Sequence, residues 1–271
     1  MRIFNFLKKY TDMNMIIIWV AGGLGNQLFF INKALELKPN SRFVFLDTKF
    51  YKNDIRYGRK FHFKGRMKII PIFNRKLIYI LFRINKILNK FNLFHFYKEN
   101  EFEMKSIKPF QIIYLTGYWQ EGFKPEKNNL QKINHLFKQI KLKEDHIVAV
   151  HFRSEEYDIK LPIDYYLNAL EEFDKEINEF HLYGDSNEYL NKMSKEIFKD
   201  TSHKIINLEK DLDEFVELKS YKNFISSNST FCWWAVILNQ DNTLKVVSPQ
   251  KWNIGYDEEY NIFRPNDWKL I

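Results

Sequence analysis

The sequence predicts an α/β protein built on parallel, Rossmann-like sheets. Short apolar segments alternate with segments of helical periodicity over residues 145–247, and this alternation is typical of parallel sheets. A βαβ pattern with a glycine-rich turn begins at Met15. Polar and charged residues gather where several of the predicted strands end, which is where open α/β sheets bind their ligands.

The composition indicates a folded protein with one large domain or two smaller ones. Of its 271 residues, 45% are hydrophobic and 17% aromatic, with 9 glycines and 7 prolines, which argues against a fibrous or disordered chain. No apolar run approaches the roughly 20 residues of a membrane-spanning helix. Residues 1–14 lack the features of a secretory signal. The single cysteine, Cys232, excludes an intramolecular disulfide and fits a reducing compartment.

The net charge of +8 at pH 7 indicates an anionic partner. Nucleic acid, a membrane surface and a phosphorylated substrate all satisfy that expectation. Genomic base composition can also produce a chain rich in Lys, Asn, Ile and Phe, without any anionic partner. The charge alone therefore does not choose among these partners.

The N-terminal half opens with a βαβ unit. We expect a buried strand over residues 15–21, a helix over 28–37 and a strand over 42–47. The turn after the first strand holds Gly23 and Gly25. Glycines at such a turn let the backbone approach a phosphate, and the helix N-terminus offers unpaired N–H groups.

A dinucleotide site is an alternative for this unit. Gly23 and Gly25 match the first two glycines of the dinucleotide fingerprint, and Asp47 lies where a ribose-binding acid would be. Leu28 occupies the third glycine position, however, which weakens the match. A nicotinamide oxidoreductase therefore stays as an alternative function.

Residues 75–97 predict a basic amphipathic helix. Two interpretations remain open: an ordinary packed helix with a solvated face, or a helix that lies on a membrane surface. Its apolar stripe consists of Leu77, Ile80, Leu81, Ile84, Ile87, Leu88 and Phe91, and its basic residues are Arg75, Lys76, Arg83, Lys86 and Lys90. Before this helix, residues 61–64 alternate and predict a strand. After it, a strand over 111–116 leads to Tyr118 and Trp119, which either stack on a sugar or pack in the core.

The second half is regular. Strands are expected over residues 146–151, 180–183, 204–208, 223–226 and 244–247, and helices over 162–176, 188–198, 211–220 and 231–239. A proline-containing segment at 124–129 marks the domain boundary. The predicted domains are residues 15–128, which carry the glycine loop, and residues 129–271.

Three polar clusters follow strands of the second half: His151 with Arg153, Gly184 with Asp185, and Ser227–Thr230. A guanidinium binds phosphate bidentately, and the Ser227–Thr230 segment begins a helix, where phosphate also binds. Asp185 is suited to accept hydrogen bonds from a base or a ribose. A nucleoside diphosphate is the natural ligand, and the lack of a Walker sequence argues against an ordinary P-loop nucleotidase.

Four motifs resemble glycosyltransferase family 11, the α-1,2-fucosyltransferases. They are GGLGNQLF at Gly22–Phe29, GYWQ at Gly117–Gln120, HFRSEEY at His151–Tyr157 and SNSTFCWW at Ser227–Trp234. The closing SPQKWN and NDWKLI segments are also similar to the family, so the resemblance runs from about Met15 to Ile271.

The resemblance implies a GT-B fold, in which two Rossmann-like domains face each other across a cleft. Residues 15–128 would then form the acceptor side, and residues 129–271 would bind the donor. It also implies an inverting mechanism with GDP-fucose as donor, without a metal ion or another cofactor. Arg153 would contact the donor diphosphate, His151 would lie near the nucleoside and Asp185 would contact guanine. The implied donor-binding residues are Gly23, Gly25, Asn26, His151, Arg153, Asp185, Ser227, Asn228, Ser229 and Thr230.

The chain departs from the family's HxRRxD motif. Ser154 replaces the second arginine, Glu155 follows, and Glu156 replaces the aspartate. Fewer cations should hold the leaving diphosphate less tightly, so another GDP-6-deoxy sugar as donor and an inactive transferase both remain alternatives. An inverting transferase needs a base for the acceptor hydroxyl, and a carboxylate is the usual one. Glu156 is the candidate, with Glu155 and Asp158 as competitors.

Asp211 and Asp213 resemble a metal-binding DxD pair, but we interpret them as the start of a helix, where acids favour the dipole. The expected function is transfer of L-fucose to the 2-hydroxyl of a galactose-type acceptor, during synthesis of a surface glycan such as O-antigen on a lipid carrier. The expected location is the cytoplasm or, peripherally, the inner membrane face. A basic nucleic-acid-binding protein is the alternative from another class, although no RNA-module signature is found.

Overall fold

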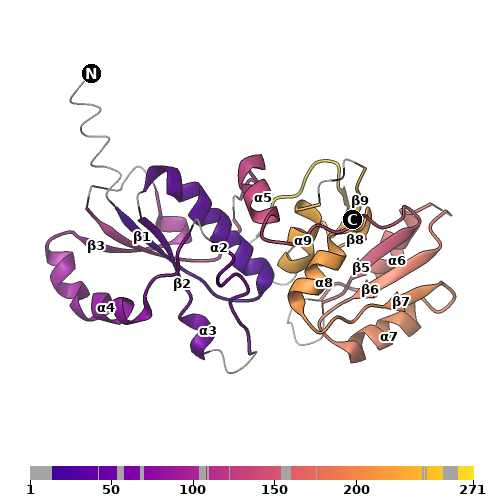
Figure 1. The fold of residues 1–271 in the computed structure, drawn as a ribbon. Coiled ribbons are helices and arrows are strands. Elements are labelled where there is room, and N and C mark those ends of the chain that lie inside the picture. Colours follow the sequence, from indigo (N-terminus) through magenta and orange to yellow (C-terminus); the bar gives the residue numbers. More distant parts are fainter. Residues whose placement is uncertain are drawn as a thin grey trace, which may run out of the picture. The chain divides into compact units, whose positions relative to one another are not determined.

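The computed structural model describes residues 14–41, 43–53, 58–67, 70–103, 108, 110–121, 123–153, 160–174, 176–239, 241, 243–252 and 262–271. The chain divides into two compact units (Figure 1). Unit 1 comprises Met1–Gln120 and Pro125–Leu136, and unit 2 comprises Glu121–Lys124 and Phe137–Ile271. The predicted boundary between residues 128 and 129 falls inside helix α5 (Lys127–Asn134), which belongs to unit 1.

Unit 1 contains a parallel sheet with the strand order β2-β1-β4-β3 among the described residues. The strands are β1 (Met15–Trp19), β2 (Phe43–Asp47), β3 (Phe94–Lys98) and β4 (Ile112–Thr116). Ile17 of β1 is in register with Phe45 on one side and Tyr114 on the other. Ile16, Ile17 and Ile18 of β1 are fully buried, as expected for a central parallel strand.

The helices of unit 1 are α2 (Leu24–Leu37), α3 (Phe50–Asn53), α4 (Arg75–Lys90) and α5, with short 3₁₀ turns at Lys38–Asn40 and Glu99–Glu101. Helix α2 begins four residues before the predicted start, because Gly23 is its N-cap. Helix α4 packs through Ile78 against a cluster that contains Ile17, Phe94 and Tyr114.

Two predictions for unit 1 are wrong. The helix predicted over 75–97 ends at Lys90, and Phe94–Lys98 forms the edge strand β3. Asn92 adopts a left-handed conformation with φ of 57°, which stops the helix and redirects the chain. Residues 61–64 form a turn instead of a strand, and its backbone bonds to the side chain of Gln27, as described below.

Unit 2 has the strand order β10-β9-β8-β5-β6-β7, and all of these pairings are parallel. The strands are β5 (Ile147–His151), β6 (Glu179–Tyr183), β7 (His203–Ile205), β8 (Asn223–Ile225), β9 (Lys245–Ser248) and β10 (Lys269–Leu270). If β5 is numbered 1 and the later strands follow in chain order, the sheet reads 3-2-1-4-5-6 from β7 to β10, which is the Rossmann order. The point where the strand order reverses lies between β5 and β8.

The crossover helices of unit 2 are α6 (Ile163–Glu171), α7 (Asn187–Ile197), α8 (Asp211–Leu218) and α9 (Thr230–Ile237). Each strand and helix predicted for this half is present, with ends shifted by a few residues. Strand β10 was not predicted, because its two residues are too few for a period and it pairs with β9 from the far end of the chain.

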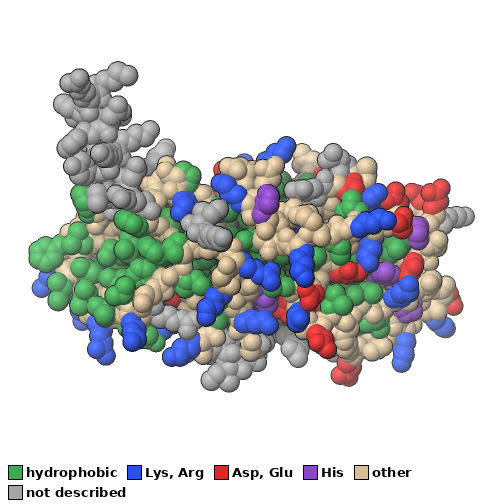
Figure 2. Space-filling view, viewed as in Figure 1, with side chains coloured by type: hydrophobic (Ala, Val, Ile, Leu, Met, Phe, Trp, Pro, Cys, Tyr) green, Lys and Arg blue, Asp and Glu red, His purple; other side chains and the backbone are tan. Residues whose placement is uncertain are grey.

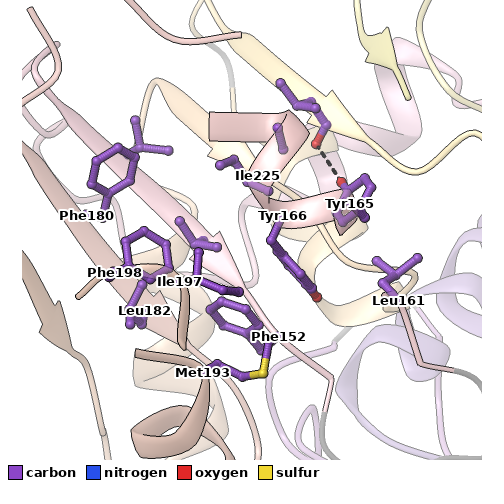
Figure 3. Close-up of a cluster of buried hydrophobic side chains, with 14 of the residues drawn as sticks. Phe152, Leu161, Tyr165, Tyr166, Phe180, Leu182, Met193, Ile197, Phe198 and Ile225 are labelled. Atoms are coloured by element: carbon purple, nitrogen blue, oxygen red, sulfur yellow. Dashed lines mark hydrogen bonds between the residues drawn. The ribbon is translucent and has the colours of Figure 1, made fainter. Parts of the chain in front are cut away.

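The core of unit 2 lies beneath helices α6 and α7 (Figure 3). Phe152, which directly follows β5, is fully buried, and its ring centroid lies 4.4 Å from that of Tyr166. Tyr165 is also buried, and its hydroxyl donates a 2.6 Å hydrogen bond to the backbone oxygen of Ser226, just after β8. Helix α6 is therefore fixed to the ends of both strands that flank the reversal point.

Both units are Rossmann-like α/β domains with parallel sheets, as predicted. Within the described ranges, no helix is both long enough and apolar enough to cross a membrane.

Candidate functional site

The candidate site in unit 2 lies at the carboxyl ends of β5, β6 and β8. His151 ends β5, Gly184 follows β6, and Ser226 follows β8. In a Rossmann sheet, the crossovers leave in opposite directions at the reversal point and open a crevice there. The three polar clusters predicted from the sequence therefore lie at the edge of one sheet, around its ligand-binding position.

His151 is a buried, neutral group that connects β5 to the segment after β8. Its Nδ1 lies 2.7 Å from Oγ of Ser227, and only 6% of the residue is exposed. Burial lowers the pKa of His151 to about 4; the nearby charge of Asp185 opposes this shift and that of Arg153 adds to it. The imidazole is thus uncharged at neutral pH, and it acts here through hydrogen bonding.

Arg153 reaches the segment between β8 and α9. Its guanidinium donates a 2.7 Å hydrogen bond to the backbone oxygen of Asn228. Helix α9 begins two residues later at Thr230. Ser229 is its N-cap residue, and the Ser229 side chain makes no capping hydrogen bond to the helix. A guanidinium and a helix N-terminus at the same loop are two sources of positive potential that suit a phosphate group.

Buried polar atoms lie along the same edge of the sheet. Among the described residues, Oδ1 of Asn228 and the hydroxyls of Ser226 and Ser248 have no hydrogen-bond partner. The Asn228 side chain is held in place, because its Nδ2 donates to the backbone oxygen of Trp252 at 3.3 Å. A buried polar atom without a partner costs about 1–3 kcal/mol, so a hydrogen bond to any of these atoms would stabilise this edge.

Gly184 allows the end of β6 to lie against the end of β5. A Cβ atom at this position would lie 2.9 Å from the backbone oxygen of Phe152, which is closer than van der Waals contact allows. Glycine therefore fits here and larger residues do not. The next residue, Asp185, is exposed, and its negative charge acts on both His151 and Glu214.

Glu214 is a site residue that the sequence did not reveal. It lies in the first turn of α8, where Asp211 and Asp213 also lie, as expected for a helix start. Burial and, to a lesser extent, the charges of Asp211 and Asp185 together raise the pKa of Glu214 from 4.5 to about 7. No motif marks this position, because its burial depends on how α8 packs. Carboxylates here can accept hydrogen bonds from N–H and O–H donors of a nucleoside.

Replacing Glu214 with glutamine should stabilise the protein above pH 7 and have little effect near pH 4.5. The folded state binds the Glu214 proton more tightly than the unfolded chain, whose pKa is 4.5. Binding of this proton contributes at most about 3 kcal/mol to the free energy of unfolding. That contribution is complete below pH 4.5 and is lost as pH rises through about 7. Urea unfolding at several pH values measures the difference between variant and wild type.

The matched control for this prediction is Glu196→Gln, on the exposed surface of α7, which should show no such trend. His151 contributes in the opposite direction, because its pKa is lowered from 6.5 to about 4 and its contribution is lost as pH falls through that range. Because variant and wild type both contain His151, its contribution cancels in the difference between their free energies of unfolding. A pH-independent difference for Glu214→Gln would contradict the assigned environment.

The glycine loop of unit 1 is built around Gly22. This residue has a positive φ of 79°, and a Cβ atom there would lie 2.6 Å from Nδ2 of Asn26. Gly23 is the N-cap of α2, and no described atom lies within 4 Å of the position a Cβ would take there. Gly25 and Asn26 belong to the first turn of α2. Backbone N–H groups at this turn can thus be approached closely.

Two motifs that are distant in sequence meet in unit 1. Nε2 of Gln120, from the GYWQ motif, donates a 3.0 Å hydrogen bond to Oδ1 of Asn26, from the GGLGNQ motif. Gln27 is fully buried and binds the backbone of Lys60 and His62, which explains the turn at 61–64. The amides of Gln27 and Gln120 therefore have a structural role, because they hold loops against the start of α2.

The aromatic pair of GYWQ divides into two roles. Trp119 is buried, with φ of 57°, whereas 47% of Tyr118 is exposed. The Tyr118 backbone N–H donates to Glu99 at 2.8 Å, which fixes the turn. Tyr118 is the member that has surface available for stacking on a sugar.

Asp47 does not support the dinucleotide alternative. Its side chain is fully buried, and it accepts hydrogen bonds from the Tyr114 hydroxyl at 2.6 Å and from the Lys49 N–H at 2.8 Å. A ribose-binding acid must be accessible to a ribose. Asp47 instead links the end of β2 to the middle of β4, across β1.

The structure places the predicted donor residues in two groups. His151, Arg153, Asp185 and Ser227–Thr230 lie together in unit 2, whereas Gly23, Gly25 and Asn26 lie in unit 1. The predicted base Glu156, its competitors Glu155 and Asp158, and Ser154 lie outside the described residues. Within the described part of the chain, no group of three or more His, Cys, Asp or Glu residues is arranged to hold a metal ion.

No protein-family model matches the chain. The chain is 25% identical to an α-1,2-colitosyltransferase of Escherichia coli over 297 residues, covering 96% of this chain and 99% of that protein. A family 9 glycosyltransferase structure from Veillonella parvula matches with a TM-score of 0.50 at 10% identity, covering 96% of this chain and 87% of that one. The E. coli ADP-heptose LPS heptosyltransferase II structure matches with a TM-score of 0.49 at 11% identity, covering 95% and 90%.

The E. coli relative supports a glycosyltransferase, and the family 9 structure supports the GT-B class of fold. They do not confirm family 11, so the resemblance to that family stays a prediction.

Proposed function

We propose that the protein is an inverting glycosyltransferase that moves a 6-deoxy sugar from its GDP derivative to the 2-hydroxyl of a galactose-type acceptor. The observation that carries this proposal is the position of Arg153, which is bound to the loop at the N-terminus of α9 beside the reversal point of the unit 2 sheet. The name of the E. coli relative supports transfer of a deoxy sugar through an α-1,2 linkage.

The diphosphate is proposed to lie between Arg153 and the first turn of α9. Negative charge grows on the leaving GDP during transfer, and donors that are already positioned stabilise that charge without reorganisation. Ser227, Asn228, Ser229 and Thr230 supply hydroxyl, amide and backbone groups around the same turn. This arrangement needs no metal ion, so transfer is expected to persist in EDTA.

The nucleoside is proposed to lie toward Asp185 and Glu214. Guanine presents an N1–H and an adjacent amino group on one edge, and a carboxylate can accept from both. Uracil and adenine do not offer this pair of neighbouring donors. A site with exposed Asp185 beside partly buried Glu214 therefore favours GDP over UDP and ADP.

The sugar is proposed to be L-fucose or a close deoxy analogue. Colitose, named in the relative, is L-fucose without its 3-hydroxyl, so the two donors differ by a single polar group. The acceptor hydroxyl needs a base, for which Glu156 remains the candidate. The proposed product is a surface-glycan unit, built on a lipid-linked acceptor.

Calorimetric titration of the full chain with GDP, GDP-fucose, GDP-colitose, UDP and NAD tests this proposal, with EDTA present throughout. The expected result is binding of the GDP compounds at least tenfold tighter than that of UDP, and no NAD binding. A transfer assay with galactose-containing acceptors then separates fucose from colitose as the donor sugar. A folded protein that binds no GDP compound would overturn the proposal.

A further inference from the structure

Helix α4 of unit 1 presents an apolar stripe that packing does not use. Leu77, Ile80, Ile84, Ile87 and Phe91 recur at intervals of three and four residues, so they share one side of the helix. Their exposed fractions are 49, 52, 36, 59 and 71%, respectively. Contiguous exposed apolar surface of this kind marks an interaction site more often than isolated exposed residues do.

A different side of α4 holds the helix to the sheet. Ile78 is buried against the cluster of Ile17, Phe94 and Tyr114, and Leu81, Phe82 and Leu88 pack on it as well. The Phe82 ring centroid lies 5.2 Å from that of Tyr114. The single apolar stripe expected from the sequence is thus two faces: a packed face and an exposed stripe.

The third side of α4 is basic. Lys76, Arg83, Lys86 and Lys90 are exposed and lie on the far side of the stripe from the packed face. The 16 residues of the helix include no Asp or Glu. Figure 2 shows hydrophobic side chains gathered over the α4 region, with Lys and Arg side chains along their edge.

We propose that the exposed stripe of α4 docks this protein onto an anionic membrane surface. A helix with an apolar side flanked by Lys and Arg inserts the apolar side among acyl chains and leaves its cations at the headgroups. The charge of α4 is complementary to anionic lipid. A second copy of the chain would instead bring two basic faces together, which opposes pairing through this helix.

The test is cosedimentation of the full chain, without nucleotide, with phosphatidylcholine vesicles that either contain or lack phosphatidylglycerol. We expect at least tenfold tighter binding when phosphatidylglycerol is present. The double variant Ile80→Ser with Ile87→Ser should lose at least tenfold in binding to these vesicles. The double variant Lys86→Gln with Lys90→Gln should lose most of the preference for phosphatidylglycerol.

Matched controls come from exposed positions of unit 2. Ile163→Ser with Leu167→Ser removes a similar exposed apolar pair from α6, and Lys195→Gln with Lys199→Gln removes two exposed charges. Both controls should bind vesicles like wild type. Thermal unfolding shows whether each variant is folded, and the exposure of the altered side chains predicts that it is.

Wild-type protein that stays in the supernatant with both kinds of vesicle would overturn the proposal, as would a folded stripe variant that binds like wild type. Sedimentation velocity without lipid gives the other decisive result. If wild type is a dimer that the stripe substitutions convert to a monomer, the stripe binds a second copy and not lipid. Vesicle binding involves no sugar nucleotide, so its failure is distinguishable from failure of the proposed donor site.

Discussion

Replacing Arg153 with alanine is expected to lower the transfer rate by about a hundredfold or more while the protein stays folded. The guanidinium lies at the loop that begins α9 and donates to the backbone oxygen of Asn228. Removing one positioned donor for the developing negative charge costs about 10²–10³ in rate in comparable sites. The measurement is the rate of sugar transfer at saturating acceptor, together with the Kd for GDP by calorimetry.

Two further variants sharpen this prediction. Arg153→Lys keeps the charge but not the planar pair of donors, so it should recover only part of the rate. Arg66→Ala removes an exposed arginine of unit 1, whose guanidinium donates to the backbone oxygen of Leu136 at 3.4 Å, and should transfer at the wild-type rate. Wild-type turnover by Arg153→Ala would show that the diphosphate binds elsewhere.

Replacing Phe152 with alanine is expected to lower the free energy of unfolding by about 3–5 kcal/mol, the usual range for truncating a buried phenylalanine. Phe152 is fully buried, and its ring packs against Tyr166 and, with a centroid separation of 6.5 Å, against Phe198. Its backbone N–H donates to Tyr183 at 2.8 Å, which continues the pairing of β5 with β6. Urea denaturation followed by circular dichroism measures the loss.

The same substitution should also weaken GDP binding, because Phe152 lies between His151 and Arg153 and fixes the direction in which both point. Leu167→Ala, on the exposed side of α6, is the control and should change stability by less than about 0.5 kcal/mol. An unchanged unfolding midpoint for Phe152→Ala would show that this part of the core is not packed as the structure has it.

The sequence predicted unit 2 almost element by element, because its strands are short apolar runs separated by amphipathic helices. The polar residues that end those runs had to lie at one edge, since every strand is parallel. His151, Arg153, Asp185 and the Ser227–Thr230 segment could therefore be placed from their positions in the chain. The prediction of Glu156 as base still awaits a test.

The remaining features depend on contacts that are distant in sequence. The predicted helix over residues 75–97 includes most of β3, because the apolar residues of β3 continue the stripe of α4 without a proline or glycine between them. The burial of Glu214, the bond between Tyr165 and Ser226 and the contact between Asn26 and Gln120 each join separate elements. Local periodicity carries no information about such pairs.

The single thiol of the chain directly follows the proposed donor site. Cys232 lies in the first turn of α9, it is fully buried, and burial raises its pKa to about 12. Thiol reagents react with the thiolate, so the folded protein should resist them until α9 leaves the sheet. The rate of modification then reports how often α9 separates from the sheet. A ligand that binds only the folded form lowers this rate by mass action. Unmodified wild-type protein can therefore reveal its own ligand through the kinetics of labelling, without a chromophore or a known acceptor.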